Sequence, residues 1–163
     1  MQRSTILITV AALAACSPAA NSVSASNNTE AEPLPTLTRS NMQWDVVLQA
    51  LFRGTLYLDN NGCIRAGDDS GPLIVWHPDS RIERTGDGRF RITDGYTGHS
   101  AYIGAEVAMG GGVGSAMPTN LVEPIPEACR SEEYWVTAHL MSEEDRQALL
   151  ERERNRKPVP APE

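Results

Sequence analysis

Ser70 is the residue in this sequence that most invites a chemical interpretation. It lies in the stretch RAGDDSGPLIVWH, residues 65–77, after two aspartates and before a glycine. A serine hydroxyl becomes a nucleophile when a histidine accepts its proton and a carboxylate orients that histidine. The chain contains three histidines, at His77, His99 and His139. A serine hydrolase is therefore the first chemistry to test.

The spacing of these residues favours a turn over a catalytic site. The segment Asp69-Ser70-Gly71-Pro72-Leu73 is similar to the nucleophile segment GDSGGPL of chymotrypsin-like proteases, but only one glycine follows the serine. Those enzymes carry the histidine and the aspartate before the serine, whereas all three histidines here follow Ser70. Asp-Asp-Ser-Gly-Pro is typical of a turn, because carboxylates accept hydrogen bonds from nearby N–H groups. We predict a turn between two strands and no enzymatic activity; a hydrolase that pairs Ser70 with His77 is the alternative.

The other candidate ligand sites are incomplete. The glycine run at residues 110–114 lacks the lysine and the hydroxyl residue of a phosphate-binding loop. Residues 59–62, DNNG, begin like a calcium loop, but position twelve is Ser70 and not glutamate. The three histidines have no metal-ligand spacing. We expect no metal and no cofactor, and a flexible or bulged connection at residues 110–114, where close approach of a ligand to the glycines is the alternative.

The N-terminus carries the most specific signal. Residues 5–15 form an uncharged, mostly apolar run of eleven residues after Arg3. This run is too short for the roughly 20 residues of a membrane-spanning helix and has the length of a secretory signal. Its end, Leu13-Ala14-Ala15-Cys16, resembles the bacterial lipobox. The resemblance implies that residues 1–15 are a cleaved signal peptide and that Cys16 is lipidated; a soluble secreted protein cut near Ser24 is the alternative.

Lipidation of Cys16 would make the bilayer the first partner of the chain. Each buried CH₂ of an acyl chain contributes about 0.8 kcal/mol, so two or three chains anchor a protein durably. Ser17 follows the cysteine where an aspartate would alter sorting, and the resemblance implies the inner leaflet of the outer membrane, facing the periplasm. Cys63 and Cys129 then form an even pair, which in an oxidising compartment is expected to be bridged. Two buried free thiols are the alternative.

Charge and composition divide the rest of the chain. Without residues 1–15 one of the 14 basic residues is lost against 21 acidic ones, and this acidic balance argues against nucleic acid as a partner. Residues 16–38, small, polar and punctuated by proline, are predicted to be a disordered tether with a reach of roughly 25 Å. Residues 157–163 are predicted to be a disordered tail. The domain between them divides into a β-barrel at 39–141 and a surface helix at 142–156, capped by Ser142.

Short apolar runs alternate with turn residues through the middle of the chain, which is typical of an all-β domain. We predict a mainly β fold, a small OB-like or related barrel with one C-terminal helix. Residues 40–54 fit either a helix or a long first strand kinked at Gly54, and the strand is favoured. Four short motifs follow one another over residues 50–115: Gly54-Thr55-Leu56, Gly62-Cys63-Ile64-Arg65, Leu73-Ile74-Val75-Trp76 and Gly104-Ala105-Glu106-Val107. Their order resembles a group of bacterial envelope proteins, which implies no activity. The expected strands span residues 55–58, 63–66, 73–76, 81–84, 89–93, 102–109 and 134–140.

The tryptophans Trp44, Trp76 and Trp135 are expected in the core of so small a domain. The alternative is an exposed ligand-binding platform of Tyr134 and Trp135 beside Arg130, since aromatic rings stack well on glycans and peptides. We therefore expect a non-enzymatic envelope lipoprotein, an interaction or structural module that contacts an envelope protein. A small-ligand or glycan-binding periplasmic module is the second hypothesis.

Overall fold

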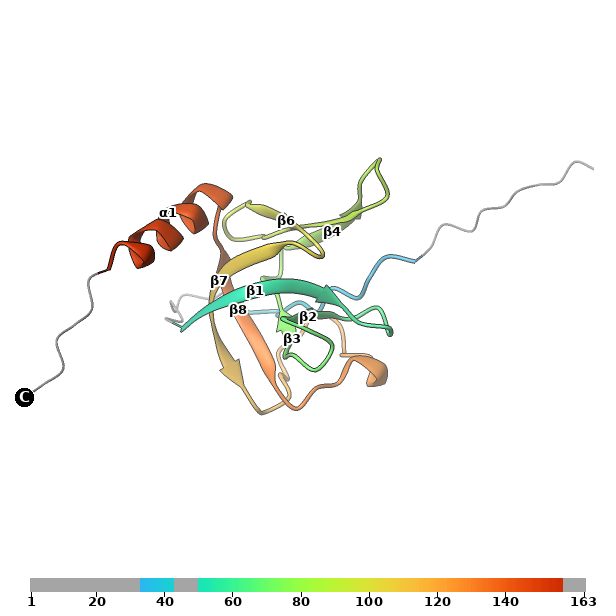
Figure 1. Ribbon diagram of the computed structural model, residues 1–163. Helices are drawn as coiled ribbons and strands as arrows, with labels where there is room; N and C mark the ends of the chain where they lie inside the picture. Colours follow the sequence, from blue (N-terminus) through green and yellow to red (C-terminus); the bar gives the residue numbers. More distant parts are fainter. Residues whose placement is uncertain (1–32, 43–49, 157–163) are drawn as a thin grey trace, which may run out of the picture. The chain divides into compact units, whose positions relative to one another are not determined.

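A five-stranded barrel forms the centre of the protein (Figure 1). The computed structural model describes residues 33–42 and 50–156. The barrel runs in the order β1 (Ala50–Leu58), β2 (Ile64–Ala66), β3 (Leu73–Val75), β8 (Tyr134–Leu140) and β7 (Glu106–Gly114), and β7 pairs again with β1. Every pair is antiparallel except β3 with β8, which is parallel. The predicted mainly β fold, with an OB-like barrel and one C-terminal helix, is confirmed.

A second sheet covers the barrel core. It consists of β4 (Arg81–Arg84), β5 (Phe90–Thr93) and β6 (Ser100–Tyr102), with β5 in the middle. Alternating residues of a strand face opposite sides, so Ile82 and Ile92 share one face. Ile92 is fully buried in the same cluster as the barrel residues Leu56 and Trp76. The barrel and the small sheet therefore share one hydrophobic core.

Asp94 fastens the small sheet to the barrel. Its buried carboxylate accepts the backbone N–H of Leu140 at 3.0 Å, at the end of β8. It also accepts the hydroxyl of Thr97 at 2.7 Å and the backbone N–H of Thr97 at 3.2 Å. A buried carboxylate is tolerated when its oxygens are bonded in this way. The hairpin between β5 and β6 is thereby held against β8.

One predicted strand is wrong, and one ambiguous segment is settled. Residues 102–109 were expected to form one strand bent at Gly104, but the chain turns there and separates β6 from β7. Gly104 has φ +88°, and the N–H of Ala105 bonds to the C=O of Tyr102, which closes a tight turn. The ambiguous stretch 40–54 is a strand from Ala50 onward, as favoured, while residues 43–49 lie outside the described part of the chain.

The glycine run at residues 110–114 is a strand and not a loop. It belongs to β7 and pairs with β1 on one side and with β8 on the other, with a register shift between Gly110 and Gly111. A Cβ on Gly110 would lie 2.2 Å from the His139 ring, and one on Gly111 would lie 2.3 Å from the carbonyl oxygen of Val136. Gly110 and Gly111 are thus needed for close packing between β7 and β8, and the flexible or bulged connection predicted here is wrong.

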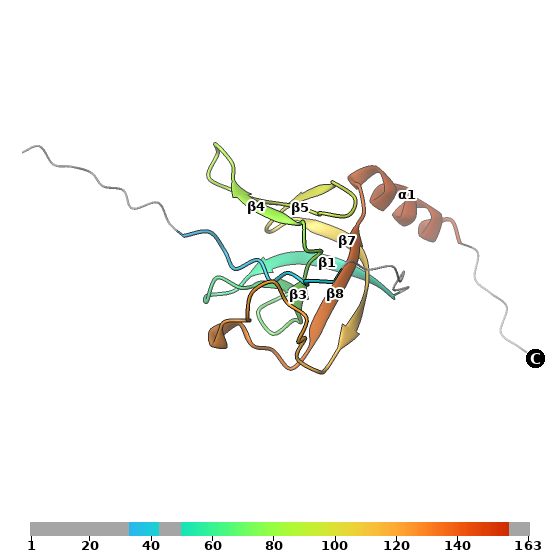
Figure 2. The same cartoon turned by 180° about the vertical axis from the view of Figure 1, so that it is seen from behind.

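The segment before the barrel packs on it. Residues 33–42, here called the N-terminal strap, run beside the end of β3 (Figure 2). The N–H of Thr36 bonds to Gly62, the C=O of Thr38 accepts from Trp76, and the N–H of Ser40 bonds to Trp76. The prediction that a disordered tether extends to residue 38 is therefore wrong from residue 36 onward. The composition of these residues predicted disorder. It could not show the hydrogen bonds that order the strap, because their partners lie far away in the sequence.

A surface helix ends the described chain. Helix α1 (Glu143–Arg154) begins as predicted at Ser142, whose hydroxyl accepts the N–H of Asp145 at 3.0 Å. It buries no residue completely, and ion pairs of Arg146 with Glu106 and of Glu153 with Arg53 link it to the barrel. Hydrogen bonds from Arg146 and Gln147 lower the pKa of Glu143 to about 2. The helix is held mainly by charges at its surface.

Replacing Gly111 tests the close packing of β7 on β8. The change Gly111→Ala places a methyl group against Val136 and the Trp135 ring, so we expect the free energy of unfolding to fall by roughly 1–3 kcal/mol. Urea unfolding followed by tryptophan fluorescence measures this. Gly114→Ala is the matched control in the same strand, because nothing lies within 4 Å of its Cβ position. Equal stability of the two variants would contradict the packing argument.

Candidate functional site

The face on which OB barrels bind oligomeric ligands is covered in this protein. Such barrels use the outer face of strands 2 and 3 together with the loops between strands 1 and 2 and between strands 4 and 5. In this protein the two strands are β2 and β3, and the first loop is the turn at residues 59–63. The second loop connects β7 to β8 and spans residues 115–133; it is here called the covering loop. Outward-facing Leu73, Val75 and Tyr134 are buried in one cluster with Ile125 of the covering loop. That face is closed to an oligomeric ligand.

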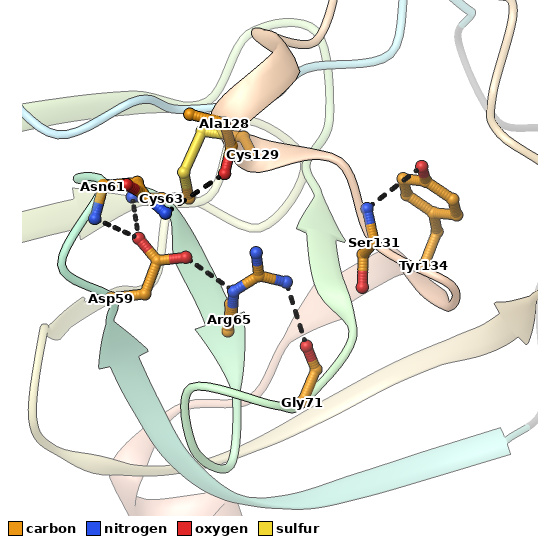
Figure 3. The surroundings of a disulfide bond; sticks show 9 residues. All are labelled: Asp59, Asn61, Cys63, Arg65, Gly71, Ala128, Cys129, Ser131 and Tyr134. Atoms are coloured by element: carbon orange, nitrogen blue, oxygen red, sulfur yellow. Dashed lines mark hydrogen bonds and ion pairs between the residues drawn. A yellow bond between two sulfur atoms is a disulfide. The ribbon is translucent and has the colours of Figure 1, made fainter.

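A disulfide holds the covering loop in place (Figure 3). Cys63 just before β2 and Cys129 in the covering loop are joined, with Cα atoms 5.5 Å apart and a sequence separation of 66. Both residues are buried, at 0% and 1% exposure. The expected bridge is therefore present, and it joins the two loops that border the OB ligand face.

A buried ion pair lies beside the disulfide (Figure 3). Arg65 Nε donates to Asp59 Oδ2 at 2.7 Å, and Arg65 Nη1 donates to the C=O of Gly71 at 3.2 Å. Asp59 Oδ1 accepts the N–H groups of Asn61 and Cys63, each at 2.9 Å. Burial acts to raise the pKa of Asp59, but the hydrogen bonds from Cys63, Arg65 and Asn61 outweigh it and the pKa is lowered. Asp59 is thus a structural anion with its oxygens engaged.

The alternative of an exposed aromatic platform at Tyr134 and Trp135 is wrong, and the expected burial of Trp135 in the core is confirmed. Their exposures are 2% and 4%, because Tyr134 lies beneath the covering loop and Trp135 points into the barrel core. The Tyr134 hydroxyl accepts the N–H of Ser131 at 3.3 Å, and only Arg130 of the three is exposed. Rings buried in this way offer no stacking surface. Trp76 is also in the core, as expected, while Trp44 lies outside the described residues.

Ser70 has no histidine partner. Its hydroxyl donates to Asp68 at 2.7 Å, and its N–H donates to the same oxygen at 3.0 Å, which forms the predicted turn. Hydrogen bonds from Ser70 lower the pKa of Asp68. Nδ1 of His77 accepts the N–H of Asp79 at 3.3 Å, while Nδ1 of His99 lies 3.0 Å from the C=O of Leu140. The structure therefore does not bring the parts of a hydrolase together.

The described residues hold neither a metal-ligand cluster nor a membrane-spanning helix. Among residues 33–42 and 50–156, no group of three or more histidine, cysteine or acidic residues is arranged to hold a metal ion. Within the same residues, no helix has the length and apolar character needed to cross a bilayer. Cys16, the predicted lipidation site, lies outside the described residues.

An open groove lies between the strap and the small sheet. This strap groove has a volume of about 820 Å³, and it is lined by strap residues 34–39, by residues 80–83 at β4, by Thr93, and by Glu123, Pro124 and Pro126 of the covering loop. None of these lining residues is aromatic. No motif in the sequence marks the groove, because its three walls come from segments that lie tens of residues apart.

The charges of the strap groove are only partly paired. Arg39 lies 3.8 Å from Glu123 and also donates to the C=O of Pro78 at 3.2 Å. Glu83 accepts from Arg91 Nε at 2.8 Å. Arg81 is exposed, and among the described residues it has no acidic partner. One positive charge of the groove is therefore available to a ligand.

Reducing the disulfide tests its role in holding the covering loop. In the chain-entropy model a bridge over this length contributes about 4 kcal/mol to stability, so reduction or the double change Cys63→Ser, Cys129→Ser should lower the free energy of unfolding by up to that amount. Urea unfolding with and without reductant measures the difference. A reduced protein as stable as the oxidised one would show that packing of Ile125 and Tyr134 holds the loop alone.

The Asp59–Arg65 pair predicts a dependence on pH. Because the folded-state pKa of Asp59 lies below its ordinary value of 3.8, its stabilisation is complete above that value and is lost as the pH falls through the folded-state pKa. Asp59→Asn keeps the acceptor for the two N–H groups but leaves Arg65 buried without its anion, which costs roughly 3 kcal/mol. We expect this variant to be less stable near neutral pH and to lose less stability on acidification to about pH 3.

Asp87 supplies the control for this measurement. The Arg89 Nε–Asp87 Oδ2 pair has the same 2.7 Å distance, but both side chains are at least half exposed. Hydrogen bonds from Thr85 and Arg89 lower the pKa of Asp87 to about 2, yet water screens the pair. Asp87→Asn should change the unfolding midpoint little. Similar losses in the two variants would show that burial is not what makes the Asp59 pair matter.

Comparisons with known proteins give no further guide. No protein-family model matches the chain, and searches of curated proteins and of solved structures find no significant match. The likeness to OB barrels thus rests on the closed five-strand order and on the parallel β3–β8 pair. The strap groove is therefore identified as the candidate site by its geometry and its charges alone.

Proposed function

We propose that the protein is a lipid-anchored envelope protein whose barrel binds a partner protein at the strap groove and catalyses no reaction. The observation that carries the binding role is the groove itself, an open recess of about 820 Å³ beside Arg81, which has no acidic partner within residues 33–42 and 50–156. Its size falls within the range of ligand sites. The OB ligand face, by contrast, is buried beneath the covering loop.

The absence of a catalytic role is proposed from the partners of the candidate side chains. Ser70 is engaged by Asp68, Asp59 by Arg65, and Asp94 by Leu140 and Thr97. A general base needs a free acceptor within reach of a substrate proton, and a nucleophile needs such a base beside it. These carboxylates and hydroxyls instead bind the fold together.

The second candidate, a small-ligand or glycan-binding module, has weaker support. The groove volume alone would suit a small molecule. Glycan recognition, however, depends on aromatic rings that stack on sugars, and the described lining of the groove contains none. A protein segment, which offers backbone groups and mixed side chains, fits this lining better.

Anchorage at Cys16 supports the envelope location and gives the first test. The resemblance of residues 13–16 to a lipobox predicts that the full chain sediments with bacterial membranes and incorporates an alkyne-labelled fatty acid. The change Cys16→Ala should abolish labelling and move the protein to the soluble fraction. Ser17→Ala is the control and should leave labelling intact. Unchanged labelling of the Cys16→Ala variant would refute the anchor.

Partner binding at the groove is tested by photo-crosslinking in cells. A photoreactive amino acid replaces Glu123, whose side chain is 81% exposed at the groove, and in a matched variant it replaces Glu144 on α1. We expect one protein to be crosslinked at position 123, in near-stoichiometric amount, and not at position 144. Absence of any protein crosslink at position 123 would contradict the proposed function and favour small-molecule screens.

A further inference from the structure

The backbone of Ile82 forms an open edge at the middle of β4. In an antiparallel pair, alternate residues exchange hydrogen bonds with the neighbouring strand. The C=O of Phe90 accepts the N–H of Ile103, so the backbone of Phe90 faces β6. The backbone of the next residue, Arg91, therefore faces β4 and bonds with Glu83. By the same alternation, the N–H and C=O of Ile82 point away from β5. Among the described residues they have no hydrogen-bond partner.

The strap presents a second open edge to the same groove. Thr36 and Thr38 bond toward Gly62 and Trp76. In an extended segment the residue between them points the opposite way, so the backbone of Leu37 faces away from β2 and β3, and it has no hydrogen-bond partner among the described residues. Leu37 and Ile82 both line the strap groove. The groove thus has unpaired backbone donors and acceptors on two of its walls.

Unpaired backbone groups along a groove are what an extended peptide needs. A peptide that adds to a sheet edge gains main-chain hydrogen bonds for affinity and places alternate side chains against the walls for specificity. The walls here offer the apolar rings of Pro35, Pro124 and Pro126. A small molecule would leave most of this edge unused.

Charge determines which peptide fits. Glu83 is paired with Arg91, and Arg39 lies within 4 Å of Glu123, whereas Arg81 has no acidic partner among the residues that the structure describes. The whole chain carries a formal charge of −7, so an acidic segment is repelled from the surface at large and attracted only where a cation is free. A basic segment would bring a second cation beside Arg81.

We propose that the strap groove binds an extended acidic segment of the partner protein, which adds as a strand to the open edge of β4 and pairs a carboxylate with Arg81. The proposal rests on the proposed function, in which the groove receives a protein. Because β4 has four residues and Arg81 and Glu83 face β5, the added strand bonds to the backbone of Ile82. Short edges of this kind resist indiscriminate pairing, so the salt bridge to Arg81 supplies selectivity.

The test uses the full chain in detergent micelles and a fluorescein-labelled octapeptide of alternating threonine and glutamate. Fluorescence anisotropy should show binding of this peptide and not of the matched threonine–lysine peptide. Arg81→Glu should weaken binding of the glutamate peptide roughly tenfold and allow binding of the lysine peptide. Arg152→Glu on α1 changes the net charge equally and should leave binding unchanged. Equal binding of both peptides to the unaltered protein would overturn the proposal.

Methylated peptides separate strand addition from simple charge attraction. N-methylation of every second amide, in the set that faces β4, should abolish binding, while methylation of the other set should preserve it, because only one set bonds to the edge. Equal effects of the two methylated peptides would refute the added strand. If a protein crosslinks at position 123 in cells and the glutamate peptide does not bind, the strand proposal fails and the proposed function stands. If the glutamate peptide binds and no protein crosslinks at position 123, the proposed function fails, and with it the partner segment, while the binding of an acidic strand at Ile82 and Arg81 stands.

Discussion

The bond between Cys63 and Cys129 is the constraint on which the arrangement of the outer surface depends. It joins the turn after β1 to the covering loop, and the Asp59–Arg65 pair fixes the same turn from the other side. With these loops fixed, Tyr134, Leu73 and Val75 gain a hydrophobic cover that a barrel of this size could not otherwise provide. Leu121 of the covering loop also forms an isolated antiparallel β-bridge with Ser40 of the strap.

Closing the OB face has consequences for function. The loops that bind ligands in other OB barrels are here used to complete the hydrophobic packing. What stays open is the junction of strap, β4 and covering loop, where three segments meet without filling the space between them. In our proposal, the partner therefore binds at the edge of the β4–β5–β6 sheet and not on the face of the barrel. A site of this kind is defined by backbone groups and by one arginine rather than by a catalytic set.

The fold could be predicted from sequence further than the site. Alternating patterns placed β4, β5 and β8 within one residue, and the Ser142 cap located the start of α1, because these signals are local. The even number of cysteines after Cys16 suggested the bridge. Local pattern failed where distant residues decide the structure. It left open an exposed platform at Tyr134 and Trp135, which the covering loop and the core enclose, and it predicted disorder at Thr36, which is bonded to Gly62. The strap groove has walls from three distant segments, so no single window of sequence contains it.

The strap also sets an order of assembly. It is the first described segment to be synthesised, yet its partners are Cys63, Trp76 and finally Leu121, which are translated later. The barrel itself closes through β1 with β7 and through β3 with β8, pairings of high sequence separation that form slowly. A nascent chain therefore carries the strap incompletely docked until Leu121 has been made. The earliest described segment to leave the ribosome must wait for residues translated about 80 positions later before its contacts are complete.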